Sequence, residues 1–180
     1  AKITGQNGFE HNGTGGTIEL ANPGNEQVGN TLITSSGAIS VPSVANVGVP
    51  STLGVGQSFK FTVNNTTFRF TGTSGSTDRT FYQNAGASQD VTVEHTGSGT
   101  LAFTGKFLSG NNNAHGFIFN VADPSGVIEN NGVIENGGTG RLWLYKRGTG
   151  TQILSAANTY TGDTVIDDGT LGLAASGSLN

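Results

Sequence analysis

The sequence predicts an all-β protein, most simply a right-handed parallel β-solenoid (β-helix), and three observations lead to this prediction. Apolar residues come in very short alternations, such as Val165-Ile166 and Leu171-Gly172-Leu173, which Gly, Asn or Asp closes within a few residues. This punctuation leaves no room for a helix of about ten residues and favours short strands with tight corners. The second observation is a long internal repeat, and the third is the composition. The same strand spacing also permits an antiparallel β-sandwich, which remains the alternative.

The composition suits strands with a polar, weakly charged surface. Of 180 residues, 30 are Gly and 11% are charged, against ordinary frequencies of about 7% and about 25%. Periodic apolar residues and a net charge of −4 argue against disorder. The mild negative charge also argues against a nucleic-acid partner, which would need a basic stripe. The sequence contains no apolar run of about eighteen residues, so no membrane-spanning helix is predicted. It contains no cysteine, so no disulfide can form.

Residues 1–75 are predicted to form an irregular or hairpin-capped N-terminal β region. Within it, the stretch Gln57–Gly72 contains two alternating apolar segments around an Asn64-Asn65 step, which can adopt positive φ. This pattern predicts an antiparallel hairpin. Lys60 and Arg69 should face water, while the phenylalanines of both strands face one core: Phe59, Phe61, Phe68 and Phe70. Such a hairpin would seal the end of a solenoid.

Residues 76–180 are predicted to form the solenoid itself, as a fragment whose repeat continues past the end. Val91–Gly105 overlays on Leu142–Ala156 at an offset of 51 residues, which fits two or three rungs. The overlay predicts shared inward columns for two apolar pairs, Val91/Leu142 and Val93/Leu144. It also superposes identical corners, Gly97/Gly148, Gly99/Gly150 and Thr100/Thr151. Between the two copies, Gly126–Asn131 is echoed by Gly132–Gly137, which predicts either a strand, corner and strand or an ordinary hairpin.

The segment Ala156–Ala174 resembles the passenger-associated repeat of bacterial autotransporters, whose pattern is roughly L-x-x-x-N-x-Y-T-G-x-T-x-I-x-x-G-x-L. Nine residues fall on this pattern in register, the first of them just before the segment: Leu154, Asn158, Tyr160, Thr161, Gly162, Thr164, Ile166, Gly169 and Leu171. The resemblance covers one repeat near the C-terminal end of the chain. It implies a surface-exported β-solenoid, an extracellular location on the bacterial cell and an outer-membrane-attached passenger.

One run of outward residues is a candidate binding surface. Arg141, Trp143, Tyr145 and Arg147 share one parity, opposite to that of the inward leucines beside them. In the overlay, the last three replace Thr92, Glu94 and Thr96. Aromatic rings flanked by arginines can stack on sugars and bind carboxylates, or they can contact protein. We therefore expect a glycan, a cell-surface protein or a second copy of the chain as the partner.

Catalytic, metal and cofactor sites are not predicted. Asp163, Asp167 and Asp168 cluster, and paired carboxylates can act as general acid and base. Parallel β-helix pectinases use such pairs, but their ordered motifs are missing, and Asp167-Asp168 precedes Gly169 as turn-forming residues commonly do. The histidines are isolated, without the spacing of metal ligands: His11, His95 and His115.

The predicted function is therefore structural or adhesive and not enzymatic. The chain is expected to be a stalk or adhesion surface of a secreted, cell-surface passenger, serving biofilm formation or attachment to host cells or glycans. Two alternatives remain, a carbohydrate-active β-helix enzyme and an extracellular subunit that assembles through its open strand edges.

Overall fold

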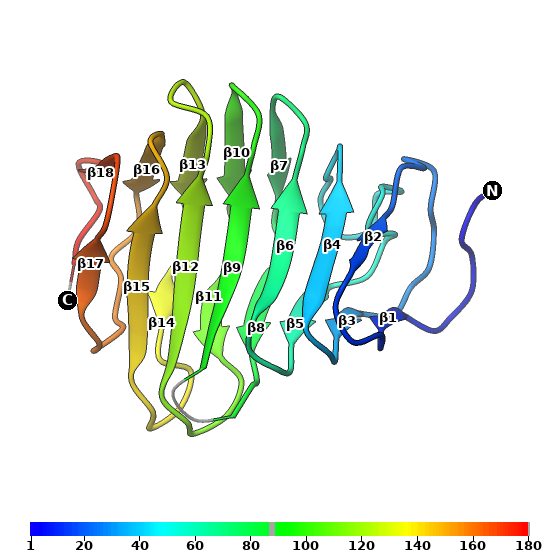
Figure 1. Ribbon diagram of the computed structural model, residues 1–180, viewed down its shortest axis with the longest axis horizontal. Coiled ribbons are helices and arrows are strands. Elements are labelled where there is room, and N and C mark those ends of the chain that lie inside the picture. Colours follow the sequence, from blue (N-terminus) through cyan, green and yellow to red (C-terminus); the bar gives the residue numbers. More distant parts are fainter. Residues whose placement is uncertain (87–88, 180) are drawn as a thin grey trace.

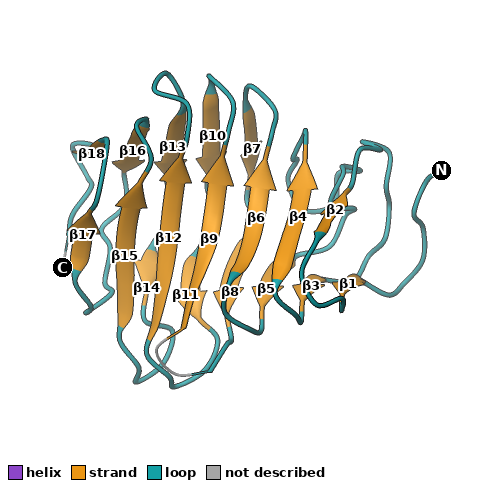
Figure 2. Cartoon of the chain, in the orientation of Figure 1, coloured by secondary structure: helices purple, strands orange, loops and turns teal. Residues whose placement is uncertain are grey.

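The protein winds into a three-sided β-solenoid, described here from a computed structural model over residues 1–86 and 89–179 (Figure 1). Asn180, where a further turn was expected, lies outside the described residues. The first side, sheet A, is formed by β1 (Phe9–His11), β3 (Thr31–Ile33), β5 (Ser58–Phe61), β8 (Thr80–Gln83), β11 (Phe107–Ser109) and β14 (Ile134–Glu135). Within the described ranges all regular structure is strand, and loops join the three sides (Figure 2).

Two further sheets complete the solenoid. Sheet B contains β2 (Thr17–Glu19), β4 (Gly37–Val41), β6 (Thr66–Phe70), β9 (Gln89–His95), β12 (His115–Val121), β15 (Leu142–Arg147) and β17 (Thr164–Ile166). Sheet C contains β7 (Gly75–Thr77), β10 (Thr100–Phe103), β13 (Val127–Asn130), β16 (Thr151–Leu154) and β18 (Thr170–Leu173). Every strand pairing among the described residues is parallel. The solenoid prediction is confirmed, and the antiparallel sandwich is excluded.

The predicted hairpin at residues 57–72 is wrong. β5 pairs with β3 and β8 in sheet A, whereas β6 pairs with β4 and β9 in sheet B. Asn65 does adopt a positive φ of 53°, but the chain uses it to turn a corner between sheets. The four phenylalanines are buried and Lys60 and Arg69 lie on the outer faces, as predicted. The division of the chain near residue 75 stays a prediction, because continuous pairing does not reveal separately folding units.

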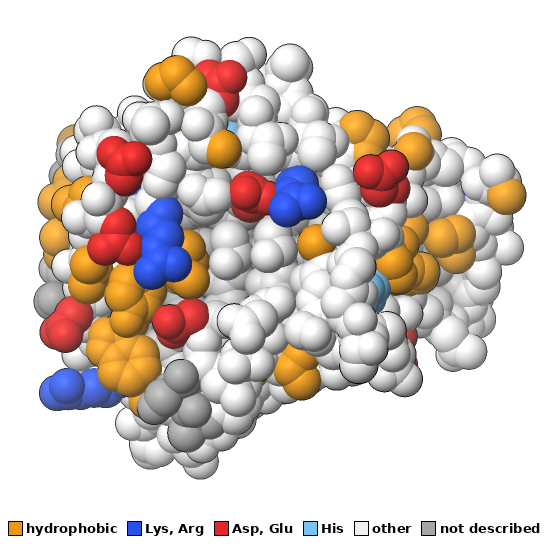
Figure 3. Space-filling model, in the orientation of Figure 1, with side chains coloured by type: hydrophobic (Ala, Val, Ile, Leu, Met, Phe, Trp, Pro, Cys, Tyr) orange, Lys and Arg blue, Asp and Glu red, His pale blue; other side chains and the backbone are white. Residues whose placement is uncertain are grey.

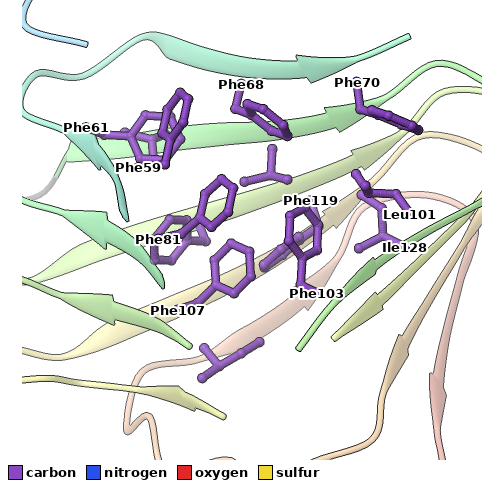
Figure 4. Packing of buried hydrophobic residues seen from close by; sticks show 14 of the residues in the cluster. Phe59, Phe61, Phe68, Phe70, Phe81, Leu101, Phe103, Phe107, Phe119 and Ile128 are labelled. Atoms are coloured by element: carbon purple, nitrogen blue, oxygen red, sulfur yellow. The ribbon is translucent and has the colours of Figure 1, made fainter. Parts of the chain in front are cut away.

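A continuous column of aromatic rings fills the core (Figure 4). In sheet A, Phe59 pairs with Phe81 and Phe81 with Phe107 across neighbouring rungs. Their rings stack at centroid distances of 5.3 Å and 4.9 Å, close to the strand spacing of about 4.8 Å. Rings from the other two sheets meet this column edge-on, including Phe68 and Phe103. Because the rungs pair in parallel register, phenylalanines at the same inward position of successive rungs stack on one another.

The rung of β3 and β4 is closed on the third side by a long loop, residues 42–57, and not by a strand of sheet C. Arg79 is buried and fastens this loop, because its guanidinium donates hydrogen bonds to the carbonyls of Gly54 and Gly56, at 2.6 Å and 3.0 Å, and also to that of Ala45. Burial lowers the pKa of Arg79, against the opposing effect of Asp78. The buried cation is thus satisfied by backbone oxygens.

The overlay at 51 residues is right in sheet C and wrong in sheet B. Thr100 and Thr151 both pair with Val127 and lie two rungs apart at the predicted offset. In sheet B, however, Phe117 pairs with Val91 and with Leu144, an offset of 53 residues. Val91 therefore lies in the same inward row as Leu144 and not in that of Leu142, although all these residues do face the same core. Counted between equivalent rows, the chain advances nine positions from Val91 to Thr100 but seven from Leu144 to Thr151, a difference of two that an overlay without gaps cannot represent.

Candidate functional site

β15 carries the predicted surface residues on the outer face of sheet B. Its side chains alternate strictly, with Leu142 and Leu144 fully buried. On the opposite parity, two aromatic residues are partly exposed and two arginines are exposed, which confirms the predicted orientation. These four residues are called the β15 patch: Arg141, Trp143, Tyr145 and Arg147.

The neighbours of the β15 patch differ from those that the overlay predicted. Because the true offset in sheet B is 53 residues, Trp143 lies beside Gly116 and, one strand further, Asp90. Tyr145 lies in the row of Thr92, and Arg147 lies in the row of Glu94. Asp90 is therefore part of the surroundings of the patch, and local sequence patterns did not indicate it.

Gly116 leaves a notch in this face that its neighbours fill. A Cβ atom at this position would lie 2.2 Å from the Asp90 Oδ1 atom and 2.9 Å from the Tyr145 Cε2 atom. Any larger residue at this position would therefore displace both side chains. Burial raises the pKa of the Asp90 carboxyl, while Arg147 opposes this shift. Burial likewise raises the pKa of the Tyr145 hydroxyl, and nearby carboxylates, Asp90 first among them, add to the effect.

Two contacts orient Arg147, at the C-terminal end of β15. The Arg147 guanidinium lies 5.7 Å from the centre of the Tyr145 ring, and its Nε atom donates to the Asp167 Oδ2 atom at 2.7 Å. Both partners of this ion pair are exposed, so the pair contributes little to stability. Its effect is to hold the guanidinium beside the aromatic ring, where a ligand could contact both.

Trp143 is partly covered by the chain itself. Its Cδ1 atom lies 2.7 Å from the position that a Cβ atom of Gly162 would occupy, so the indole lies against the corner before β17. The rest of the ring faces solvent in part. Figure 3 views this side of the molecule, where apolar side chains gather beside basic and acidic ones over the β15 and β17 end.

Lys146, between Tyr145 and Arg147, points inward and was not singled out from the sequence. It is fully buried, and its Nζ atom donates to the carbonyls of Arg147, Gly148 and Asp168 at 2.6, 2.6 and 3.1 Å. Burial lowers its pKa, while Asp168 opposes this. Its parity with Leu142 and Leu144 would have placed it inside. Lys146 therefore ties the corner above β15 to the next rung and fixes the base of the patch.

The three aspartates that were considered as catalytic groups are all exposed. Asp167 pairs with Arg147, whereas Asp168 uses its Oδ1 atom to accept a hydrogen bond from the backbone N–H of Gly169 at 2.7 Å. Gly169 has a φ of 71°, so it forms the expected left-handed corner residue after the two aspartates. Asp167 and Asp168 thus make contacts that orient an arginine and form a turn.

A row of alternating charges crosses sheet B above the patch. Successive strand pairings place four outward residues in one row, and Asp167, directly after β17, continues it: Arg69, Glu94, Asn120, Arg147 and Asp167. The row holds two ion pairs, Arg69 with Glu94 and Arg147 with Asp167. Between them, the Asn120 amide donates to the Glu94 Oε1 atom at 2.8 Å. The row carries no net charge and spans five adjacent strands.

Over the described ranges, no group of three or more His, Cys, Asp or Glu residues is arranged to hold a metal ion. In the same residues, no helix has the length and apolar character needed to cross a membrane.

Comparison with known proteins agrees with this architecture. Residues 144–173 match the passenger-associated-transport-repeat family, in the region where the repeat was predicted. The parallel solenoid and this repeat together are the features expected of an autotransporter passenger. The chain is also similar to the adhesin BmaC autotransporter of Brucella suis biovar 1 (strain 1330), with 33% identity over 145 residues, or 78% of this chain. The aligned part is only 4% of that protein's length. No solved structure matches the chain.

The chain thus contains a passenger-associated transport repeat and is similar to an autotransporter adhesin, which gives its location as the extracellular surface of the bacterial cell, attached to the outer membrane.

Proposed function

We propose that the chain is a non-enzymatic adhesive segment and that the β15 patch is its attachment surface, with a glycan or a cell-surface protein as the partner. The observation that carries this proposal is the outward placement of Trp143 and Tyr145, next to Arg147, on the outer face of sheet B. Contiguous apolar patches on a protein surface often mark contacts with other molecules, and two partly exposed aromatic residues lie together here. The BmaC relative is named as an adhesin, which supports the same class of function.

The rigidity of the scaffold also favours attachment. Backbone pairing continues from strand to strand, and the side chains beneath the patch are buried. The aromatic rings therefore lose little conformational freedom on binding. Stalk behaviour and attachment in biofilms or to host cells would follow from the same scaffold.

The experiment is an adhesion assay with cells or beads that display the chain, tested on host-cell layers and immobilised glycans. Trp143→Ala should weaken attachment by about 1–3 kcal/mol, as loss of an aromatic anchor does, with thermal stability nearly unchanged. Arg69→Gln is the matched control, because Arg69 lies on the same face but three strands away. If Trp143→Ala lowers the melting temperature while adhesion is intact, Trp143 is a packing residue and the patch is not the working surface.

A second candidate function is self-association, which the charge row favours. A two-fold axis parallel to β12 at Asn120 would place Glu94 of one copy opposite Arg147 of a second copy. The same axis would place Arg69 opposite Asp167, so the row is complementary to itself in this arrangement. Self-complementary faces are the basis of two-fold dimers.

Charge exchange tests this second candidate. Glu94→Arg and Arg147→Glu should each remove self-association, because like charges then face each other across the axis. A mixture of the two variants should restore it, since each face then meets opposite charges. Analytical ultracentrifugation of the single variants and of the mixture measures this directly, and a mixture that stays monomeric would argue against the arrangement.

A further inference from the structure

A polar hollow lies on the outer face of sheet A, away from the β15 patch. It has a volume of about 190 Å³ and is lined by side chains from three neighbouring rungs: Asn30, Gln57, Ser58, Lys60, Thr80 and Tyr82. This volume is below the roughly 300 Å³ at which pockets for drug-sized ligands begin. The hollow therefore suits one small polar unit and not an extended molecule.

The hollow exists because small and large residues occupy neighbouring rows of the sheet. Ser58 pairs with Thr80. Asn30 lies in the same row, because the next residue, Thr31, pairs with Phe59. These three short side chains form the floor. In the next row, Lys60 pairs with Tyr82, and these long side chains form a wall. The site therefore forms because strand pairing brings together residues that are more than twenty positions apart in the sequence.

The polar groups in the hollow are available to a ligand. Among the described residues, none of the six lining side chains forms a hydrogen bond or an ion pair with another protein group. Elsewhere on the outer surface, hydroxyl groups commonly bond to the preceding rung, as Thr62 does to the Ile33 carbonyl at 2.9 Å. The hollow therefore concentrates unpaired amide, hydroxyl and ammonium groups at one place.

Lys60 gives the hollow a positive charge. Its Nζ atom lies 5.5 Å from the centre of the Tyr82 ring, which holds the ammonium at the rim. Glu10 and Glu135 lie at the two ends of the row of sheet A that contains Lys60, and both contact other groups. Glu10 accepts a hydrogen bond from Thr34, and Glu135 pairs with Lys106. Both carboxylates of this row are therefore already bonded to other groups, which leaves the Lys60 ammonium open to a ligand carboxylate.

We propose that this hollow binds the carboxylated sugar unit of a glycan, a uronic acid or a sialic acid. The ligand carboxylate pairs with the Lys60 ammonium, a charge-assisted contact. The sugar hydroxyls bond to the amides and hydroxyls of the floor and of Gln57, and the ring carbons contact Tyr82. The site is independent of the β15 patch because it lies on a different sheet.

The test is a titration of the chain with two acidic probes, an oligogalacturonate and a sialyl-oligosaccharide. Two-dimensional NMR monitors the binding. The methyl ester of each probe serves as the neutral analogue. We expect saturable shifts confined to β5 and β8 with at least one acidic probe and much weaker binding of its ester. Lys60→Gln should reduce affinity for the acid by about tenfold or more.

Lys106→Gln is the matched control, since Lys106 is a lysine beside the same sheet that is already paired with Glu135. It should leave binding unchanged, and so should Trp143→Ala, which separates this proposal from the one on the β15 patch. The proposal is overturned if neither acid binds saturably, or if binding survives Lys60→Gln. It is also overturned if the methyl esters bind as well as the acids.

Discussion

Phe81 lies at the centre of the aromatic column, and Phe81→Ala tests whether that column holds the solenoid together. The ring is fully buried and contacts five other phenylalanines, at centroid distances between 4.9 Å and 6.4 Å. A buried phenylalanine removes about 150–250 Å² from water, which at about 25 cal/mol per Å² corresponds to about 4–6 kcal/mol. Alanine keeps part of this burial, so we expect a loss of about 3–5 kcal/mol.

Chemical denaturation followed by circular dichroism measures this loss. Phe9→Ala is the control, because Phe9 is only partly buried, in β1 near the N-terminal end of the solenoid, and should cost much less. A loss below about 1 kcal/mol for Phe81→Ala would refute the reasoning, because cavities in close-packed cores cost more than this.

Three further predictions concern charge and cooperativity. Asp90→Asn should stabilise the fold at neutral pH, because the raised pKa of Asp90 means that the folded state disfavours its charge. The advantage should shrink as pH falls through the raised pKa towards the ordinary value, as denaturation at several pH values would reveal; an effect independent of pH would contradict this. Lys146→Met should cost about 1–3 kcal/mol in denaturation, because three carbonyls lose their donor, and a neutral effect would contradict it. If residues 1–75 form a separate cap, calorimetry should resolve two unfolding transitions, whereas a single transition would argue for one unit.

The strands and their faces could be predicted from sequence because both are local properties. Alternation along Leu142–Arg147 places every second side chain in the core, and the structure agrees for each residue. Corner residues such as Gly169 were also visible, since a left-handed φ restricts which residues fit.

Strand partners were less predictable because they depend on corners. The Asn64-Asn65 step has the residues of a hairpin turn, yet here it joins two sides of a solenoid. The hydrophobic pattern is the same in both cases, because the phenylalanines face one core either way.

The surroundings of the candidate sites depend on register between rungs. Asp90 and Tyr145 both extend into the space beside Gly116 because this glycine lies between their strands, and Lys60 meets Tyr82 from the neighbouring rung. A difference of two residues between equivalent rows moved Trp143 from the row of Thr92 to the row of Asp90. Single-sequence patterns contain no signal for such a difference, so these contacts could not be foreseen.

Trp143 is the one tryptophan of the chain, so its fluorescence reports on the β15 patch alone. The most direct measurement is acrylamide quenching of this fluorescence in the free chain and in the chain bound to the cell surface or glycan to which it adheres. Attachment through the patch predicts that quenching falls and emission shifts to the blue on binding, because the partner covers the exposed part of the indole. Full attachment with unchanged quenching and emission would contradict the assignment of this face as the adhesive surface.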